Sequence, residues 1–350
     1  LGNTLSLMGL TVLGSILIGV PLAFISAYVH LPFKKIWLVI FAAPLAIPSY
    51  IGAFTLYAAF GPGGEINNLL GFETPPMYGL SGAAIVMTLY TFPFVMMTTR
   101  SSVLSLDASM VNAARTLGMS MTQSVFKVIL PRVVNGIAAG SLLVALYTLS
   151  DFGTPAMMRL DTFTRVIYVE YNAFALGRAA MLSLQLMVIV GFLLLIESQI
   201  KTASERHGRP LVLFPTKWQI TAMIAAFGPI LLLAIGLPLA IFFVWLARDG
   251  YSNFDFSIAW NSAYASAIAA IVAVIVAIPV AHAALTGKAG RIMERVTYFG
   301  FGIPGPTAVT NLVSNSGVVA SDTSGVGTGR YSVRGCGYGG DKGIFGFGSR

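Results

Sequence analysis

Long apolar stretches alternate with short polar connections along most of the chain. Each stretch is long enough to cross, as a helix, the hydrocarbon core of a bilayer, which is about 30 Å thick. Eight of them can be recognised, at about residues 4–28, 36–60, 80–102, 134–157, 179–200, 219–246, 261–285 and 293–313. The pattern predicts an all-α integral membrane protein that folds as a polytopic helix bundle.

The composition supports the membrane assignment. Of the 350 residues, 56% are hydrophobic and 10% are charged, whereas soluble domains carry about 25% charged residues. The net charge is +8, but the basic residues are distributed over many connections and form no patch. We therefore expect membrane lipid around the chain and no nucleic acid partner.

The distribution of Lys and Arg predicts the topology. Counted over alternate connections, one side of the membrane receives thirteen cations, namely Lys34, Lys35, Arg100, Arg115, Lys127, Arg132, Lys201, Arg206, Arg209, Lys217, Lys288, Arg291 and Arg295. The opposite side receives four, namely Arg159, Arg165, Arg178 and Arg248. Because cytoplasmic loops carry the excess of Lys and Arg, we expect the thirteen in the cytoplasm and residue 1 on the outer face of the membrane.

An internal repeat predicts how the bundle is built. Residues 3–23 recur at 261–281, with Asn, Pro and Ala at matching places and a constant offset of 258. The second copy is the sixth span after the first, and spans an even number of steps apart cross in the same direction, so the repeat is parallel. We expect a first half at 1–203 that lacks its first helix, a cytoplasmic linker at 204–218, and the beginning of a second half at 219–313.

Residues 314–350 depart from this pattern. Residues 309–350 contain 11 of the 37 glycines, and such a sequence is not expected to form a membrane helix. It is either a flexible tail or the product of a lost reading frame, and the repeat favours the second because it requires apolar residues here. The tail is expected to lie outside the fold. It contains Cys336, the only cysteine, on which no metal or redox site is expected.

One cytoplasmic connection, at 103–133, contains a recognisable helix pattern. Asp107 can cap a short helix that Gly118 ends in a left-handed conformation, and Ser120 and Gln123 have the spacing of a capping box for a second helix. The apolar stripe of the first helix is expected to contain Met110, Ala113 or Ala114, and Leu117. The pattern predicts two short helices that meet at a glycine elbow, with one face on the bundle and the other free to dock.

This loop resembles the EAA loop of ATP-binding-cassette importer permeases, which docks in a groove of the ATPase subunit. The matching positions are Asn112, Ala113, Ala114, Arg115, Gly118, Val128, Leu130 and Pro131. Asn112 stands where the family usually has Glu, and Val128 where it usually has Ile. The alternative is an amphipathic connector that touches only its own bundle.

Over residues 1–308 the chain resembles the fused iron(III)-type permeases of binding-protein-dependent importers, which carry two six-helix halves on one polypeptide. The resemblance rests on residues 19–23, 44–50, 60–64, 112–118 and 150–154. It implies the fold of a type I importer permease, two ATPase subunits on the cytoplasmic face and a periplasmic substrate-binding protein. Relatives that move thiamine, phosphonates or polyamines share this framework.

Prolines and one carboxylate mark a candidate translocation path. Pro44 and Pro48 interrupt the second apolar stretch, and the carbonyls they free must face protein or a water-filled path. Asp151 lies near the outer end of the fourth stretch, where a carboxylate is costly unless it faces a vestibule or a partner. The structural alternatives are packing kinks for the prolines and, for Asp151, a helix cap or an ion pair with Arg159 or Arg165.

The sequence contains no G-x-x-x-x-G-K-[ST] motif. We therefore expect no enzyme activity, cofactor or metal site in this chain, and ATP is expected to be hydrolysed by the partner subunit. The interpretation is an ATP-driven importer permease that moves iron(III), or a related small solute, into the cytoplasm by alternating access. The rival classes are an ion-coupled secondary transporter, which also uses parallel repeats, and a passive channel.

Overall fold

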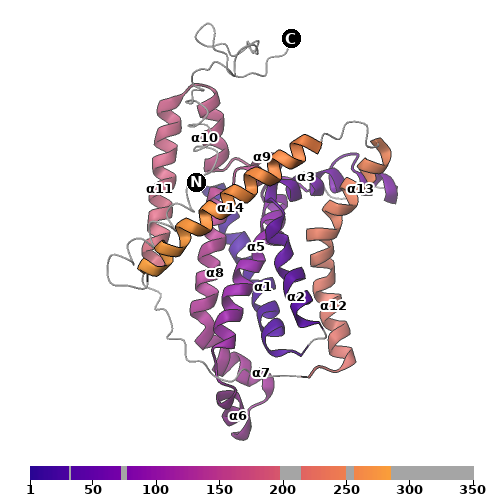
Figure 1. Cartoon of the computed structure of the whole chain (residues 1–350), viewed down its shortest axis with the longest axis vertical. Coiled ribbons are helices and arrows are strands. Elements are labelled where there is room, and N and C mark those ends of the chain that lie inside the picture. The colour runs from indigo at the N-terminus through magenta and orange to yellow at the C-terminus, as the bar shows by residue number, and fades with distance from the viewer. Residues whose placement is uncertain (31–32, 72–76, 198–213, 250–255, 285–350) are drawn as a thin grey trace. The chain divides into compact units, whose positions relative to one another are not determined.

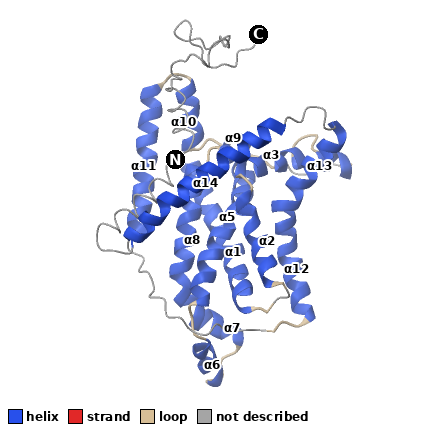
Figure 2. Ribbon diagram, in the orientation of Figure 1, coloured by secondary structure: helices blue, strands red, loops and turns tan. Residues whose placement is uncertain are grey.

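The computed structural model describes residues 1–30, 33–71, 77–197, 214–249 and 256–284. Within these ranges the chain forms helices joined by loops and contains no strand (Figure 2). Six helices are long and apolar enough to cross a membrane, namely Gly2–Tyr28, Gly79–Leu104, Met121–Ser150, Leu176–Ile196, Trp218–Arg248 and Phe256–Pro279. The prediction of an all-α polytopic bundle is confirmed. The predicted span at 293–313, the tail at 314–350 and most of the linker at 204–218 lie outside the described residues.

The chain divides into two compact units. Among the described residues, one unit contains those of 1–163 and 184–284, and the other contains 164–183. In the described part of the second unit, α10 (Phe163–Asn172) leads into the first turns of α11 (Leu176–Glu197). There the Arg178 guanidinium lies 3.3 Å from the Glu170 carboxylate. The expected halves, 1–203 and 219–313, were defined by the sequence repeat and not by compactness, and they stay a prediction.

The core of the first unit is formed by α1 (Gly2–Tyr28), α5 (Gly79–Leu104) and α8 (Leu130–Ser150), which pack side by side (Figure 1). Glycines allow both neighbours to approach the α5 backbone closely. A Cβ on Gly19 of α1 would lie 2.8 Å from the carbonyl oxygen of Phe92, and one on Gly140 of α8 would lie 2.6 Å from the Cα of Val95. Because these close contacts are to backbone atoms, α5 is held between two helices that have little room to move.

The second apolar stretch is not the single span that the sequence predicted at 36–60. It is divided into α2 (Lys34–Ala42), the 3-10 helix η1 (Ala43–Ala46) and α3 (Ser49–Phe60), and the parts before and after the break meet at 86°. A short helix, α4 (Glu65–Leu70), follows. Pro44 lies in η1 and Pro48 directly precedes α3, and proline cannot donate the backbone hydrogen bond that would continue the helix.

The fourth stretch, predicted at 134–157, also breaks. α8 ends at Ser150, and Asp151 has an extended conformation with φ −72° and ψ 127°. A separate short helix, α9 (Gly153–Met157), follows. By contrast, the third stretch is not interrupted, because Pro93 lies inside a continuous α5.

The sixth stretch forms one long helical segment with a widened turn. It consists of α12 (Lys217–Leu231), the π-helix η3 (Leu232–Gly236) and α13 (Leu237–Asp249). A π-helical turn changes the backbone hydrogen-bonding pattern, and here the Tyr90 hydroxyl donates to the buried carbonyl of Ala234 at 3.0 Å. Near the end of α13, Trp245 Nε1 and Arg248 Nη2 donate to the Glu65 carboxylate at 3.1 and 2.9 Å. These contacts attach the segment to α5 and α4.

Replacing Tyr90 by Phe is expected to lower the free energy of unfolding by about 1–3 kcal/mol, because the buried Ala234 carbonyl loses its side-chain donor. The measurement is reversible unfolding of the purified protein in detergent. Tyr50→Phe is the matched control, since Tyr50 is 50% exposed. Equal destabilisation by the two substitutions would contradict the assigned role of the Tyr90 hydroxyl.

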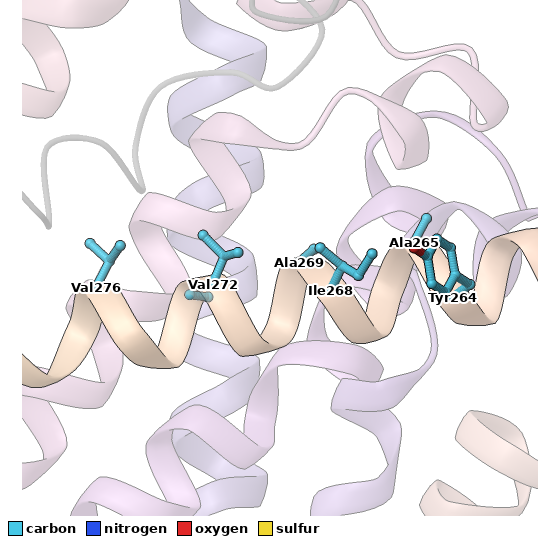
Figure 3. A pocket seen from close by; sticks show the side chains of 7 residues that line it. Tyr264, Ala265, Ile268, Ala269, Val272 and Val276 are labelled. Atoms are coloured by element: carbon cyan, nitrogen blue, oxygen red, sulfur yellow. The ribbon is translucent and has the colours of Figure 1, made fainter.

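The helix α14 (Phe256–Ala284) contains the second copy of the repeat. Pro279 lies inside it as Pro21 lies inside α1, in agreement with the offset of 258. A shallow hollow of about 750 Å³ runs along α14 (Figure 3). All of its lining residues come from this one helix, so the hollow is the side of a helix and not an enclosed binding site.

Candidate functional site

The predicted docking loop lies beyond the ends of α5 and α8, at the end of the first unit where α2 begins (Figure 1). It contains α6 (Ala108–Thr116), α7 (Met121–Ser124) and the π-helix η2 (Val125–Ile129). Asp107 caps α6 as predicted, because its Oδ1 accepts a hydrogen bond from the backbone N–H of Ser109 at 2.7 Å.

The glycine elbow is confirmed. Gly118 has φ 88°, and the N–H groups of Gly118 and Met119 donate to the carbonyls of Arg115 and Ala114 at 3.0 and 3.1 Å. This is the Schellman arrangement that ends a helix with a left-handed glycine. Beyond it, Ser120 Oγ accepts from the Gln123 N–H at 3.2 Å, and Gln123 Oε1 accepts from the Ser120 N–H at 3.1 Å. The predicted capping box is therefore present.

The second short helix differs from the prediction because it does not end before the membrane span. α7, η2 and α8 run together as one helix from Met121 to Ser150. In the π-helical turn the Leu130 N–H donates to the carbonyl of Val125, and Pro131 follows without an N–H to donate. The loop thus continues into the span α8 as one helix, with no non-helical segment between them.

The inner face of the loop packs on the bundle. Val111 and Ile129 are buried in one cluster with Val133 of α8 and Val103 of α5. Ala114 is buried as well. Of the two alternatives Ala113 and Ala114, the structure buries Ala114 and exposes Ala113, whereas the prediction was wrong for Leu117, which is exposed. α6 has nine residues, and so short a helix does not determine from its sequence alone which of two neighbouring stripes faces inward.

The residues matched to the EAA loop divide between the two faces. Those exposed to solvent are Asn112, Ala113, Arg115, Gly118 and Pro131, whereas Ala114 is buried and Val128 and Leu130 are half-buried. Two large apolar side chains on the outer side of the loop were not predicted to be exposed. Leu117 is 82% exposed and Phe126 is 63% exposed. Lys127 is exposed beside Phe126.

A second candidate site lies at the opposite end of the first unit, where α3 and α9 meet (Figure 1). The Ser49 hydroxyl donates to Asp151 Oδ1 at 2.9 Å, and the Thr154 N–H donates to Asp151 Oδ2 at 2.9 Å. The Tyr147 hydroxyl lies 3.4 Å from Ser49 Oγ and donates to it. Asp151 therefore connects the end of α8, the start of α3 and the first turn of α9. A helix cap was one of the structural alternatives that the sequence left open.

The two path prolines lie at the same break. Pro44 is buried in η1, and Pro48 is exposed and accepts a hydrogen bond from the Ile51 N–H at 2.9 Å. Ser49, the donor to Asp151, follows Pro48 directly. The structure thus brings Asp151 to the break that contains Pro48, through a contact between residues 102 positions apart.

The family of the chain follows from comparison with known proteins. Residues 19–199 match the model of a family described as binding-protein-dependent transport system inner membrane component. The chain belongs to this family. The predicted relationship to importer permeases is confirmed, and the chain is a multi-pass inner-membrane protein.

Relatives of this permease carry the names of several substrates. The chain is 28% identical over 256 residues to the Fe(3+)-transport system permease protein FbpB 2 of Haemophilus influenzae, covering 70% of this chain and 47% of the relative. It is 32% identical over 156 residues to the spermidine/putrescine permease PotB of the same organism, covering 43% and 54%. It is 26% identical over 201 residues to the sulfate permease CysT of Escherichia coli, covering 55% and 72%. The chain spans about half the length of the first two.

Proposed function

We propose that this permease is the membrane subunit of an ATP-driven importer that receives iron(III) from a periplasmic binding protein and releases it into the cytoplasm. Two ATPase subunits bind on the cytoplasmic face and hydrolyse the ATP. The observation that carries the proposal is the loop at 107–131, which is capped at both helix starts, bent at Gly118 and exposed on its outer side. The name of the relative FbpB 2 favours iron(III), and the relatives named for spermidine/putrescine and sulfate define the competing substrates.

The proposed mechanism is alternating access. ATP binding closes the ATPase pair and displaces the docked loop, and the displacement reaches the outer end of the span because Met121–Ser150 is one helix. At about 1.5 Å per residue, such a helix extends about 45 Å. Its outer end continues directly into Asp151, which contacts Ser49 at the break before α3. Movement of the loop is thereby coupled to the elements that surround the candidate path.

Replacing Gly118 by Val is expected to weaken binding of the ATPase strongly. A β-branched residue in the left-handed conformation costs about 1–2 kcal/mol, so the elbow opens and α6 loses its position relative to α7. The measurement is co-purification of the ATPase with the full-length permease, together with transport-coupled ATP hydrolysis.

Gly63→Val is the control for this experiment. Gly63 also has a left-handed conformation, with φ 69° and nothing within 4 Å of an added Cβ, but it lies in the connection between α3 and α4. It reproduces the backbone strain without touching the loop. Wild-type ATPase binding and hydrolysis in the Gly118→Val protein would refute the docking role.

The rival class is tested by the energy source. An ion-coupled transporter would continue uptake after ATP depletion and stop when the proton gradient is collapsed, whereas the importer proposed here stops with ATP. Uptake of radiolabelled iron(III), spermidine and sulfate by cells that carry or lack the full-length gene then identifies the substrate. Gene-dependent uptake of spermidine or sulfate without iron(III) would overturn the iron assignment.

A further inference from the structure

The free charges of the docking loop are all positive. Arg115, Lys127 and Arg132 are exposed, and none of the described carboxylates forms an ion pair with them. The acidic residue of the loop, Asp107, uses its carboxylate to cap α6. Asn112, exposed on α6, carries no charge. The surface offered to a partner is therefore basic.

Two large apolar side chains are exposed on this surface, and polar residues separate them along the chain. Leu117 is 82% exposed and Phe126 is 63% exposed. The exposed side chains between them along the chain are polar, namely Ser120, Thr122 and Gln123. Protein interfaces commonly bury a few large side chains in pockets surrounded by a polar rim.

We propose that the groove of the ATPase that receives this loop contains apolar pockets for Leu117 and Phe126 and a rim of Asp or Glu that faces Arg115 and Lys127. This inference rests on the proposed docking function and specifies its chemistry. It assigns the electrostatic contribution to cations of the permease and acids of the ATPase. The two cations flank the elbow, with Arg115 in α6 and Lys127 in η2, so they can contact the rim at two places.

Anionic lipid is the competing occupant of a basic apolar surface. A helix that lies in the membrane interface presents a continuous apolar face to the lipid, whereas the exposed anchors of this loop are interrupted by polar residues. The apolar face of the loop, which includes Val111 and Ile129, is already used against the bundle. The loop also lies beyond the ends of the spans α5 and α8 (Figure 1). These observations favour a protein partner.

The test measures the Kd between the purified ATPase and the full-length permease in nanodiscs. Arg115→Glu and Lys127→Glu are each expected to weaken binding about fivefold near 0.15 M salt, because each replaces an attraction by a repulsion at the rim. The loss is expected to shrink below twofold near 1 M salt, where the Debye length falls to about 3 Å. Lys35→Glu is the matched control, since Lys35 is exposed at the start of α2 and outside the loop. It is expected to leave the Kd unchanged.

The outcomes separate this inference from the docking function itself. If Gly118→Val abolishes binding while both charge reversals leave the Kd unchanged, the loop docks but the acidic rim is wrong. If none of the three loop variants changes the Kd, docking at this loop is wrong as well. If the reversals weaken binding of the permease to phosphatidylglycerol vesicles and not to the ATPase, the occupant is lipid and the proposal fails. If the ATPase with a rim carboxylate replaced by Lys regains binding to the Arg115→Glu permease, that recovery supports the proposal directly.

Discussion

Gly19→Val is expected to prevent most of the permease from accumulating in a folded form. An added Cβ at Gly19 would lie 2.8 Å from the Phe92 carbonyl oxygen and 3.0 Å from the Met96 nitrogen, and backbone atoms in the middle of α5 cannot move aside as a flexible side chain can. Overpacking of this kind costs about 3 kcal/mol. The measurement is the yield of monodisperse protein in mild detergent and its free energy of unfolding.

The control for Gly19→Val lies on the same helix. Gly9 is exposed and has nothing within 4 Å of an added Cβ, so Gly9→Val changes helix propensity without a clash. We expect its yield to match that of the wild type. Equal yields of the two variants would show that α1 and α5 are not packed as closely as described.

The second large effect is expected at Asp151. Asp151→Ala removes the acceptor of both the Ser49 hydroxyl and the Thr154 N–H, and the loss of charge-assisted hydrogen bonds together with a helix cap costs about 3 kcal/mol. Asp151→Asn retains one carbonyl acceptor and is expected to cost about half as much. The free energy of unfolding measures both losses.

A double-mutant cycle isolates the long-range contact. Combining Asp151→Ala with Ser49→Ala is expected to give a coupling of about 1.5 kcal/mol. Ser150→Ala is the control, because the Ser150 hydroxyl donates within its own helix to the Tyr147 carbonyl, and its coupling to Asp151→Ala is expected to stay below about 0.5 kcal/mol. Absence of coupling with Ser49 would contradict the contact. If uptake per folded Asp151→Asn transporter is reduced, Asp151 also has a role in the translocation path. If uptake is unchanged, its role is structural only.

The parts of the loop that could be predicted from the sequence depend on neighbouring residues. The Asp107 cap, the Gly118 elbow and the Ser120–Gln123 capping box each form within a few positions of the chain. Their residue types therefore carry the information directly. The predicted topology also rests on loop composition, through the excess of Lys and Arg, and not on packing; it stays a prediction.

The parts that could not be predicted depend on distant packing. The buried side of α6 is decided by its contact with Ile129 and Val103, so the sequence of the helix alone placed Leu117 on the wrong face. The contact between Ser49 and Asp151 joins residues 102 positions apart. The break at Pro48 was recognisable as an interruption, but the angle of 86° depends on how the following helix packs.

The continuous helix from Met121 to Ser150 has a thermodynamic consequence for the proposed importer. Because the helix connects its two ends rigidly, coupling between them acts in both directions. If docking of the ATPase alters the free energy of the outer arrangement around Asp151, then an event at the outer end alters ATPase affinity by the same factor. Docking of a loaded binding protein at the outer end would then change the affinity of the permease for the ATPase in the cytoplasm before any solute has crossed.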